Sequence, residues 1–164
     1  MAEMTRRPAD WTDRAPVKVR ATREIHATPD EVWAVLCDHE RWPEWFTDLS
    51  KAEGTGGEGL GSTRTVWIGK FAIDEEFIVW DEPRSWGFSV VRAEGPLGKV
   101  AETLNERVDI QVLADDRVRV TYLMAFQPRK LAGPLFVVLK RALGKNLRDA
   151  LSGLEKHIEA ARID

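Results

Sequence analysis

Apolar and polar residues alternate with a period of two along much of the chain, which is typical of half-buried strands. The first such stretch covers residues 17–25, with Arg23 as the one charge on its apolar parity. Residues 100–113 and 118–126 alternate most regularly, and Asp115-Asp116-Arg117 lies between them as a hairpin turn. Consecutive hairpins predict an antiparallel meander.

Three more strands are expected between these stretches, at residues 62–68, 71–81 and 85–93. Gly69-Lys70 and Glu82-Pro83-Arg84 supply the turns that separate them. Both faces of the middle strand are apolar. The sequence therefore leaves open which of its faces, that of Phe77 or that of Trp80, points into the protein.

Two short helices are predicted after the first strand. Thr28 is a good N-cap, Pro29 suits the first helical position, and Glu31 completes a capping box. Asp38 can cap a second short helix, which Pro43 interrupts.

A much longer helix is predicted at the C-terminus, where leucines recur at spacings of three and four from Leu135 to Ile158. Residues 134–161 give a rod of roughly 40 Å at 1.5 Å per residue. Such a rod must lie along or across the sheet and bury one of the sheet's faces, which predicts a two-layer α+β architecture.

The domain organisation follows from the same pattern. The chain has 164 residues, which suits one domain with a sizeable core. Residues 1–16 show no apolar period, so we expect a flexible N-terminal tail, and residues 17–164 are expected to form a single domain.

Composition narrows the class of protein. The chain is 43% hydrophobic and 31% charged, as in globular proteins, and its formal net charge is −3. This charge gives no global attraction to nucleic acid, so none is expected as a partner. The aliphatic run at residues 135–139 is far too short to span a bilayer, so no stable membrane insertion is expected.

The compartment is inferred from two features. Cys37 is the only cysteine, which excludes an intramolecular disulfide and fits a reducing compartment. The first residues lack the apolar stretch of a signal peptide. We therefore expect a cytoplasmic protein.

Common catalytic and cofactor motifs are missing from the sequence. Residues 54–59 read Gly-x-Gly-x-x-Gly, but a predicted strand follows them where a nucleotide-binding motif needs a helix. His26, His39 and His157 are scattered and are read as surface residues, so no metal site and no cofactor is expected. Cys37 is read as a small apolar residue and not as a nucleophile.

Carboxylates on the apolar parity of a strand are the main chemical candidates. Glu102 and Glu106 share parity with Leu104, and Glu75 shares parity with Phe77. A carboxylate that faces a pocket can bind a ligand hydroxyl or act as a general acid or base. For each of them the simpler interpretation is a bulge or strand end that turns the charge to solvent.

Four short motifs together resemble a known superfamily. They are Ile-His-Ala-Thr-Pro-Asp-Glu-Val-Trp at residues 25–33, Asp38 followed by Trp-Pro-Glu-Trp at 42–45, Gly-Leu-Gly-Ser at 59–62, and Trp-Asp-Glu-Pro-Arg-Ser-Trp at 80–86. Their order and spacing resemble the START-like, or SRPBCC, superfamily, and in particular its polyketide cyclase/dehydrase branch. The resemblance covers roughly residues 17–161.

The resemblance implies a helix-grip fold, in which a curved seven-stranded antiparallel sheet and two small helices surround a long C-terminal helix. It also implies a deep hydrophobic cavity between the sheet and that helix. Members of the superfamily bind lipids, sterols, polyketides, hormones or ubiquinone, and some catalyse cyclisation or dehydration. The superfamily has no universal catalytic motif to transfer to this chain.

The first hypothesis for function is the binding or carriage of a small hydrophobic ligand, such as a lipid, a polyketide or another aromatic or isoprenoid-like molecule, by a monomer or homodimer. The side chains expected at the cavity are mostly aromatic, with Tyr122 offering a hydroxyl. They are Trp33, Trp45, Trp67, Phe71, Trp86, Phe88, Tyr122, Met124, Phe126, Leu139 and Leu143. However, seven tryptophans can equally fill a large core.

Two alternatives stay open. One is an enzyme of the polyketide cyclase, aromatase or dehydratase type, with Glu102, Glu106 and Tyr122 as weak catalytic candidates. The other is a protein-interaction or regulatory module that exposes the aromatic turn at residues 42–46. That turn is more simply read as a lid over the cavity.

Overall fold

The computed structural model describes residues 1–55 and 57–163. Its strands form one antiparallel sheet in the order β2-β8-β7-β6-β5-β4-β3, with β1 paired to β6 off this path. The strands are β1 (Ala2–Glu3), β2 (Val17–Ile25), β3 (Lys51–Gly54), β4 (Thr63–Ile68), β5 (Phe71–Asp81), β6 (Ser85–Ala93), β7 (Ala101–Ala114) and β8 (Arg117–Pro128).

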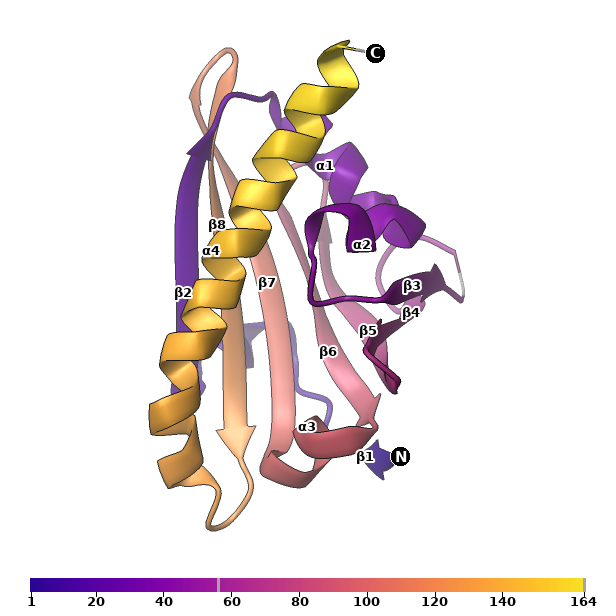
Figure 1. The fold of residues 1–164 in the computed structure, drawn as a ribbon, viewed down its shortest axis with the longest axis vertical. Coiled ribbons are helices and arrows are strands. Elements are labelled where there is room, and N and C mark those ends of the chain that lie inside the picture. Colours follow the sequence, from indigo (N-terminus) through magenta and orange to yellow (C-terminus); the bar gives the residue numbers. More distant parts are fainter. Residues whose placement is uncertain (56, 164) are drawn as a thin grey trace.

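Helices cover one face of this sheet. They are α1 (Pro29–Cys37), α2 (Trp42–Trp45), α3 (Gly95–Val100) and α4 (Gly133–Ile163), with the 3-10 turn η2 (His39–Arg41), whereas the 3-10 turn η1 (Ala9–Arg14) lies on the other face. The 31-residue α4 crosses the sheet diagonally, while α1 and α2 lie beside its C-terminal half (Figure 1). None of the helices in the described ranges is long and apolar enough to cross a membrane.

The predicted α+β helix-grip architecture is confirmed, with one correction in the strand count. The sheet has eight strands instead of seven, because Ala2–Glu3 pairs with Ala93 and Arg92 of β6. The capping box of α1 is also confirmed, since the Glu31 amide donates to the Thr28 hydroxyl at 3.3 Å and the Thr28 amide donates to the Glu31 carboxylate at 2.8 Å.

Beyond residues 1–16, two elements are absent from the sequence prediction. β3 reads Lys-Ala-Glu-Gly, and its single apolar residue is too little for a period of two. α3 contains Gly95, Pro96 and Gly98, a composition that indicates a loop. As predicted, a strand and not a helix follows the glycines at 54–59, although Gly56 lies outside the described residues.

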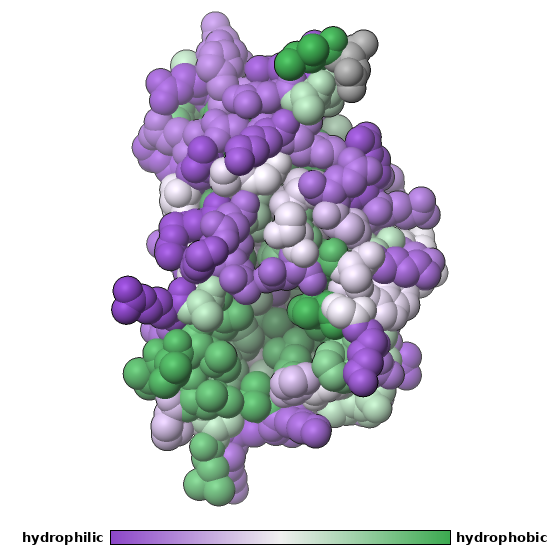
Figure 2. Space-filling model, viewed as in Figure 1, coloured by the Kyte–Doolittle hydropathy of each residue, from purple (hydrophilic) through white to green (hydrophobic). Residues whose placement is uncertain are grey.

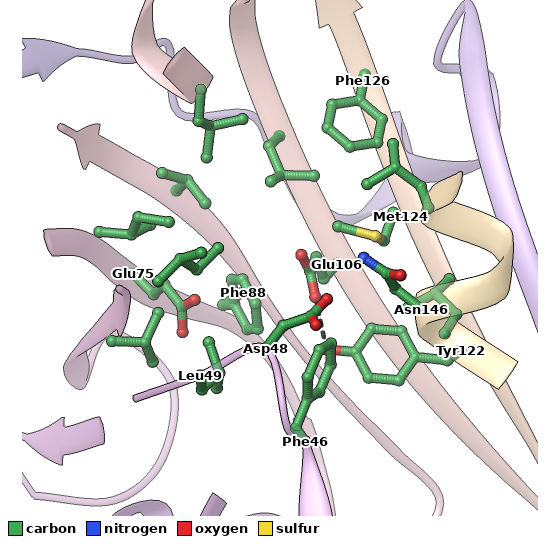
Figure 3. Close-up of a pocket in the computed structure, with 18 of the residues that line it drawn as sticks. Phe46, Asp48, Leu49, Glu75, Phe88, Glu106, Tyr122, Met124, Phe126 and Asn146 are labelled. Carbon is green, nitrogen blue, oxygen red and sulfur yellow. Dashed lines mark hydrogen bonds between the residues drawn. The ribbon is translucent and has the colours of Figure 1, made fainter. Parts of the chain in front are cut away.

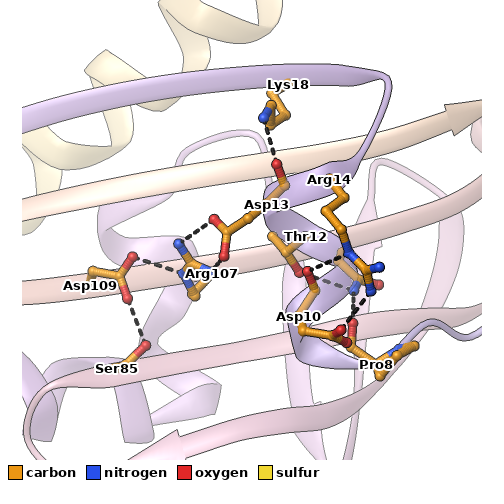
Figure 4. Close-up of polar contacts among 10 residues, drawn as sticks. Pro8, Asp10, Thr12, Asp13, Arg14, Lys18, Ser85, Arg107 and Asp109 are labelled. Atoms are coloured by element: carbon orange, nitrogen blue, oxygen red, sulfur yellow. Dashed lines mark hydrogen bonds and ion pairs between the residues drawn. The ribbon is translucent and has the colours of Figure 1, made fainter.

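Residues 1–16 pack against the outer face of the sheet, whereas the sequence predicted a flexible tail. Thr12 is buried there, and the side chain of Asn105 donates to its hydroxyl at 3.1 Å. Asp13 accepts two hydrogen bonds from Arg107, at 2.9 and 3.0 Å (Figure 4). The segment shows no apolar period because these anchoring contacts are polar.

Aromatic rings fill the end of the sheet beneath α1 and α2. Trp42 stacks on Trp86 with ring centroids 5.1 Å apart, and Phe77 contacts both Trp86 and Trp80, at 5.0 and 5.1 Å. Phe77 and Trp80 can both join this cluster because β5 changes register between Phe77 and Val79. Much of the tryptophan content is therefore core.

Candidate functional site

A cavity of about 310 Å³ lies between the inner face of the sheet and α4. Figure 2 shows the hollow where it opens on the molecular surface, bordered by apolar side chains. Eight of the residues proposed from the sequence line it. They are Glu75, Phe88, Glu106, Tyr122, Met124, Phe126, Leu139 and Leu143.

Many further residues line the cavity, and most of them are apolar. Those not proposed individually from the sequence are Trp42, Phe46, Asp48, Leu49, Arg64, Val66, Ile68, Ile73, Val90, Pro96, Leu97, Val100, Leu104, Phe136, Asn146 and Leu147. The aromatic turn at 42–46 thus contributes Trp42 and Phe46 to the wall, as a lid would, and is not an exposed patch for a partner.

Three of the predicted tryptophans belong to the aromatic core instead. Trp33 is buried on α1 against Trp80, with ring centroids 5.6 Å apart. Trp45 is buried between Trp42 and α4, and Trp86 lies under Trp42. Their size suits a cavity wall, but they pack beneath α1 and α2 and are not among the residues that line the cavity.

Trp67 and Phe71 also lie away from the cavity. Because Val66 and Ile68 point inward from β4, Trp67 points to the outer face, where the Lys51 ammonium lies 4.8 Å from its ring centroid. Phe71 is the first residue of β5 and packs against Gly95 of α3.

Glu102 and Glu106 do not share a face. The pairing of β7 with β8 shifts between Ala101 and Thr103, which leaves Glu102 as the extra residue of a bulge. Glu102 therefore does not line the cavity, whereas Glu106 lies on its inner face and is 8% exposed.

A buried ion pair forms part of the cavity wall. The Arg64 Nε donates to Glu75 Oε2 at 2.8 Å, and Arg64 Nη2 lies 2.6 Å from the same oxygen. The guanidinium carbon also lies 4.0 Å from the ring centroid of Trp42, a cation–π contact. Burial raises the pKa of Glu75, and the Arg64 charge opposes that rise.

Glu106 and Tyr122 form a second polar pair beside the first (Figure 3). The Tyr122 hydroxyl donates to Glu106 Oε2 at 2.5 Å, and both groups are buried. Burial, reinforced by the negative charge of Glu75, raises the pKa of Glu106 to about 8, although the Tyr122 hydrogen bond acts in the opposite direction. Burial likewise raises the pKa of Tyr122.

The two carboxyl groups beside Arg64 differ in charge. Arg64 balances one carboxylate, so the second carboxylate is favoured in its neutral form in this apolar surrounding. At neutral pH Glu106 therefore holds a proton that it can donate to a ligand oxygen, and above pH 8 it becomes an acceptor or base. Asp48 and Asn146 add polar groups to the same wall (Figure 3).

Some of the missed residues carry a sequence signal. Arg64 lies on the inward parity of β4 with Val66, the same signal that identified Glu75 on β5. Asn146 interrupts the leucine stripe of α4 between Leu143 and Leu147. A search for polar residues at apolar positions would have found Arg64 and Asn146, whereas the loop residues Phe46, Asp48 and Leu49 belong to no periodic pattern.

Burial keeps His39 and Cys37 uncharged. His39 is 9% exposed, stacked on Phe77 at 5.3 Å, and is not the surface residue expected. Burial and the nearby Arg64 lower its pKa to about 4, so it is neutral. Burial raises the pKa of Cys37 to about 12, which keeps its thiol protonated. Among the described residues, no group of three or more histidine, cysteine or acidic side chains could hold a metal ion.

An antiparallel sheet that grips a long C-terminal helix around an apolar cavity defines a helix-grip protein of the START-like class. The chain belongs to the family described as polyketide cyclase / dehydrase and lipid transport, whose model matches residues 16–159.

Relatives and solved structures agree with this assignment. Uncharacterized proteins of Mycobacterium tuberculosis and Mycobacterium bovis are 31% identical over 156 residues, which is 92% of this chain and 89% of theirs. A START superfamily protein from Mycobacterium smegmatis superposes with a TM-score of 0.72 at 16% identity, over 88% of this chain and 98% of that one.

Two solved enzymes share the fold. The Zhui aromatase/cyclase from Streptomyces sp. R1128 has a TM-score of 0.72 at 17% identity, over 87% of this chain and 93% of that chain. A norcoclaurine synthase mutant from Thalictrum flavum has a TM-score of 0.68 at 17% identity, over 89% of this chain and 96% of that chain. At these identities the likeness concerns the fold.

Proposed function

We propose that the protein binds or carries a small, mainly hydrophobic ligand that has one oxygen-bearing end. The observation that carries this proposal is the placement of Arg64, Glu75, Glu106 and Tyr122 as a polar cluster in an otherwise apolar cavity. Ligand pockets commonly combine apolar walls with a few polar groups that fix orientation. The volume of about 310 Å³ favours a small ligand.

The polar cluster supports a particular ligand chemistry. Protonated Glu106 donates one hydrogen bond, and an oxygen acceptor such as a ketone or a phenol suits it. Arg64 Nη1 is buried and has no hydrogen-bond partner in the described part of the chain, so it offers a second donor in the same wall. Lipids, polyketides and isoprenoid quinones all carry such oxygens.

The test is a thermal-shift and native mass spectrometry panel of fatty acids, sterols, quinones and aromatic polyketides. A true ligand raises the melting temperature, since saturation at a hundred times Kd adds about 2.7 kcal/mol of stability. Leu143→Trp fills the cavity and should abolish the shift. Ala142→Trp adds the same ring one position earlier, at an exposed site of α4, and should preserve it. If no ligand class binds, or both variants behave alike, the proposal fails.

A second candidate function is an acid–base enzyme of the cyclase, aromatase or dehydratase type. One observation favours it: a buried carboxyl with a pKa of about 8 that faces the cavity and accepts a hydrogen bond from Tyr122. Glu106→Gln should then retain ligand binding and abolish conversion, read as loss of one water from the bound ligand in mass spectra. Unchanged ligand mass with the wild-type protein would support carriage alone.

A cytoplasmic location is part of the same proposal, supported by the single thiol of Cys37. We also propose that the protein acts as a monomer or homodimer. Fractionation and light scattering test these two statements.

A further inference from the structure

An exposed apolar patch borders the mouth of the cavity. Leu131 is 99% exposed, Val137 76%, Val138 73% and Leu135 43%. We call these four residues the mouth patch. Figure 2 shows the apolar surface they form beside the hollow, along the N-terminal half of α4. Ten large apolar side chains are exposed in the described ranges, and four of them lie within these eight consecutive positions.

Exposure on this scale is unusual for a helix that packs on a sheet. Val137 and Val138 lie on the outward side of α4, next to the inward Phe136 and the cavity-lining Leu139. Leu131 adopts a positive φ of 73°, a conformation that a branched side chain rarely takes. Contiguous exposed apolar surface of this kind marks a binding surface.

The charged residues next to the mouth patch along the chain all have one sign. Residues 129–148 contain six cations and no acidic residue, in a chain whose net charge is −3. The cations are Arg129, Lys130, Lys140, Arg141, Lys145 and Arg148. Of these six cations, only Lys145 has an acidic partner among the described residues, namely Asp149. Apolar side chains that protrude among cations are typical of segments that lie on anionic lipid surfaces.

We propose that the mouth patch docks reversibly on an anionic lipid bilayer, with Leu131, Val137 and Val138 entering the interface and the cations contacting lipid headgroups. Docking in this position sets the cavity mouth, bordered by Leu139 and Leu143, against the membrane. An apolar ligand would then pass between bilayer and cavity without crossing water.

A second copy of this chain fits the patch less well. In a two-fold dimer through the patch, the cations of one copy would face those of the other, and like charges at an interface repel. An anionic membrane instead supplies the opposite charge along with an apolar phase for the valines and leucines.

Co-sedimentation with vesicles tests the proposal. The vesicles are phosphatidylcholine alone and phosphatidylcholine mixed with phosphatidylserine, each at low and high ionic strength. The wild-type protein should bind only the mixed vesicles, and high salt should weaken binding. Each cation near the surface contributes about fivefold to the affinity, so Lys140→Glu/Arg141→Glu should lose at least about tenfold.

A second double variant tests the apolar side chains of the mouth patch, and two control variants separate the effect of the patch from changes in surface hydrophobicity and net charge elsewhere. Val137→Asp/Val138→Asp should also lose at least about tenfold, because charged residues are excluded from the apolar interface. Val112→Asp/Leu113→Asp, at exposed sites near the β7–β8 hairpin, should bind normally. Arg20→Glu/Lys156→Glu has the same net charge as Lys140→Glu/Arg141→Glu and should also bind normally.

Several results would overturn the proposal. They are no binding to either vesicle, equal binding to both, or equal losses in the control variants. Dimers that Val137→Asp/Val138→Asp converts to monomers, without vesicle binding, would assign the patch to self-association. Vesicle binding is measured without ligand, so its failure leaves the ligand-binding proposal standing.

Discussion

Glu106 makes the stability of the protein depend on pH. Its pKa is about 8 in the folded state against 4.5 for an exposed glutamate, so the unfolded chain releases this proton first. The contribution of Glu106 to the free energy of unfolding is therefore fully present below pH 4.5 and is lost as the pH rises through 8. The loss contributed by this one group is on the order of 5 kcal/mol.

Glu106→Gln should remove this loss, because the amide stays neutral at every pH and still accepts from Tyr122. The variant should match the wild type near pH 5 and exceed it in stability above pH 8. Urea unfolding from pH 5 to 9 measures the difference. Parallel curves for the two proteins would show that Glu106 is ionised when folded.

Tyr122→Phe isolates the hydrogen bond itself. The Tyr122 hydroxyl lowers the pKa of Glu106, so its removal should raise that pKa further. A carbon-13 NMR titration of the glutamate carboxyl carbons measures the shift. Thr121→Ser, on the other face of β8, is the control and should leave the titration of Glu106 where it is. A fall in the pKa of Glu106 in Tyr122→Phe would contradict the expected role.

At the scale of elements, the close approach of α4 to α2 depends on Gly153. A Cβ there would run into the carbonyl oxygen of Trp45, which is backbone and cannot move aside easily. At Gly144 the nearest atom is the flexible end of Arg148, 3.3 Å away. Gly153 is therefore required by close packing, whereas Gly144 is not.

Gly153→Ala should lower the free energy of unfolding by at least about 1 kcal/mol, because overpacking outweighs the gain in helix propensity. Gly144→Ala should be neutral or raise it by up to about 1 kcal/mol. Urea unfolding of both variants supplies the comparison. A stabilised Gly153→Ala would mean that α2 shifts without cost.

Helices and strands could be predicted because short stretches of sequence specify them. The residues that line the cavity could be predicted only in strands whose alternation of inward and outward residues is not interrupted by a bulge. Regular alternation in β8 correctly placed Tyr122, Met124 and Phe126 on the inner face. The bulge at Glu102 broke the count in β7, and the register shift after Phe77 broke it in β5. A bulge depends on partner strands, which one strand's sequence does not specify.

At the scale of the whole molecule, the N-terminal segment closes the outer face of the sheet. Met4 and Thr12 are buried, and they cover polar residues of the central strands such as Ser89 and Asn105. The sequence did not predict that residues 1–16 cover the sheet. Hydrogen bonds between residues far apart in the chain produce no periodic pattern of apolar residues in the segments that they join.

Asp13→Ala should lower the free energy of unfolding by on the order of 1 kcal/mol, since Asp13 joins this segment to Arg107 of β7 through two hydrogen bonds. Asp10→Ala is the matched control in the same turn, and its ion pair with Arg14 is exposed and local. Urea unfolding should show little change for the control. Equal effects would show that the segment contributes nothing through Arg107.

Charge is unevenly distributed over the molecule. Residues 129–148 carry six positive charges, and the rest of the chain has 18 cations against 27 acidic residues, a net charge of −9. Such a separation gives the molecule an electric dipole, and a dipole turns in an external field before any contact forms. Within a screening length of about 10 Å at 0.1 M salt, a negatively charged surface turns the positive end of the molecule toward itself. The entrance of the cavity is on that leading side, so the first encounter already presents it.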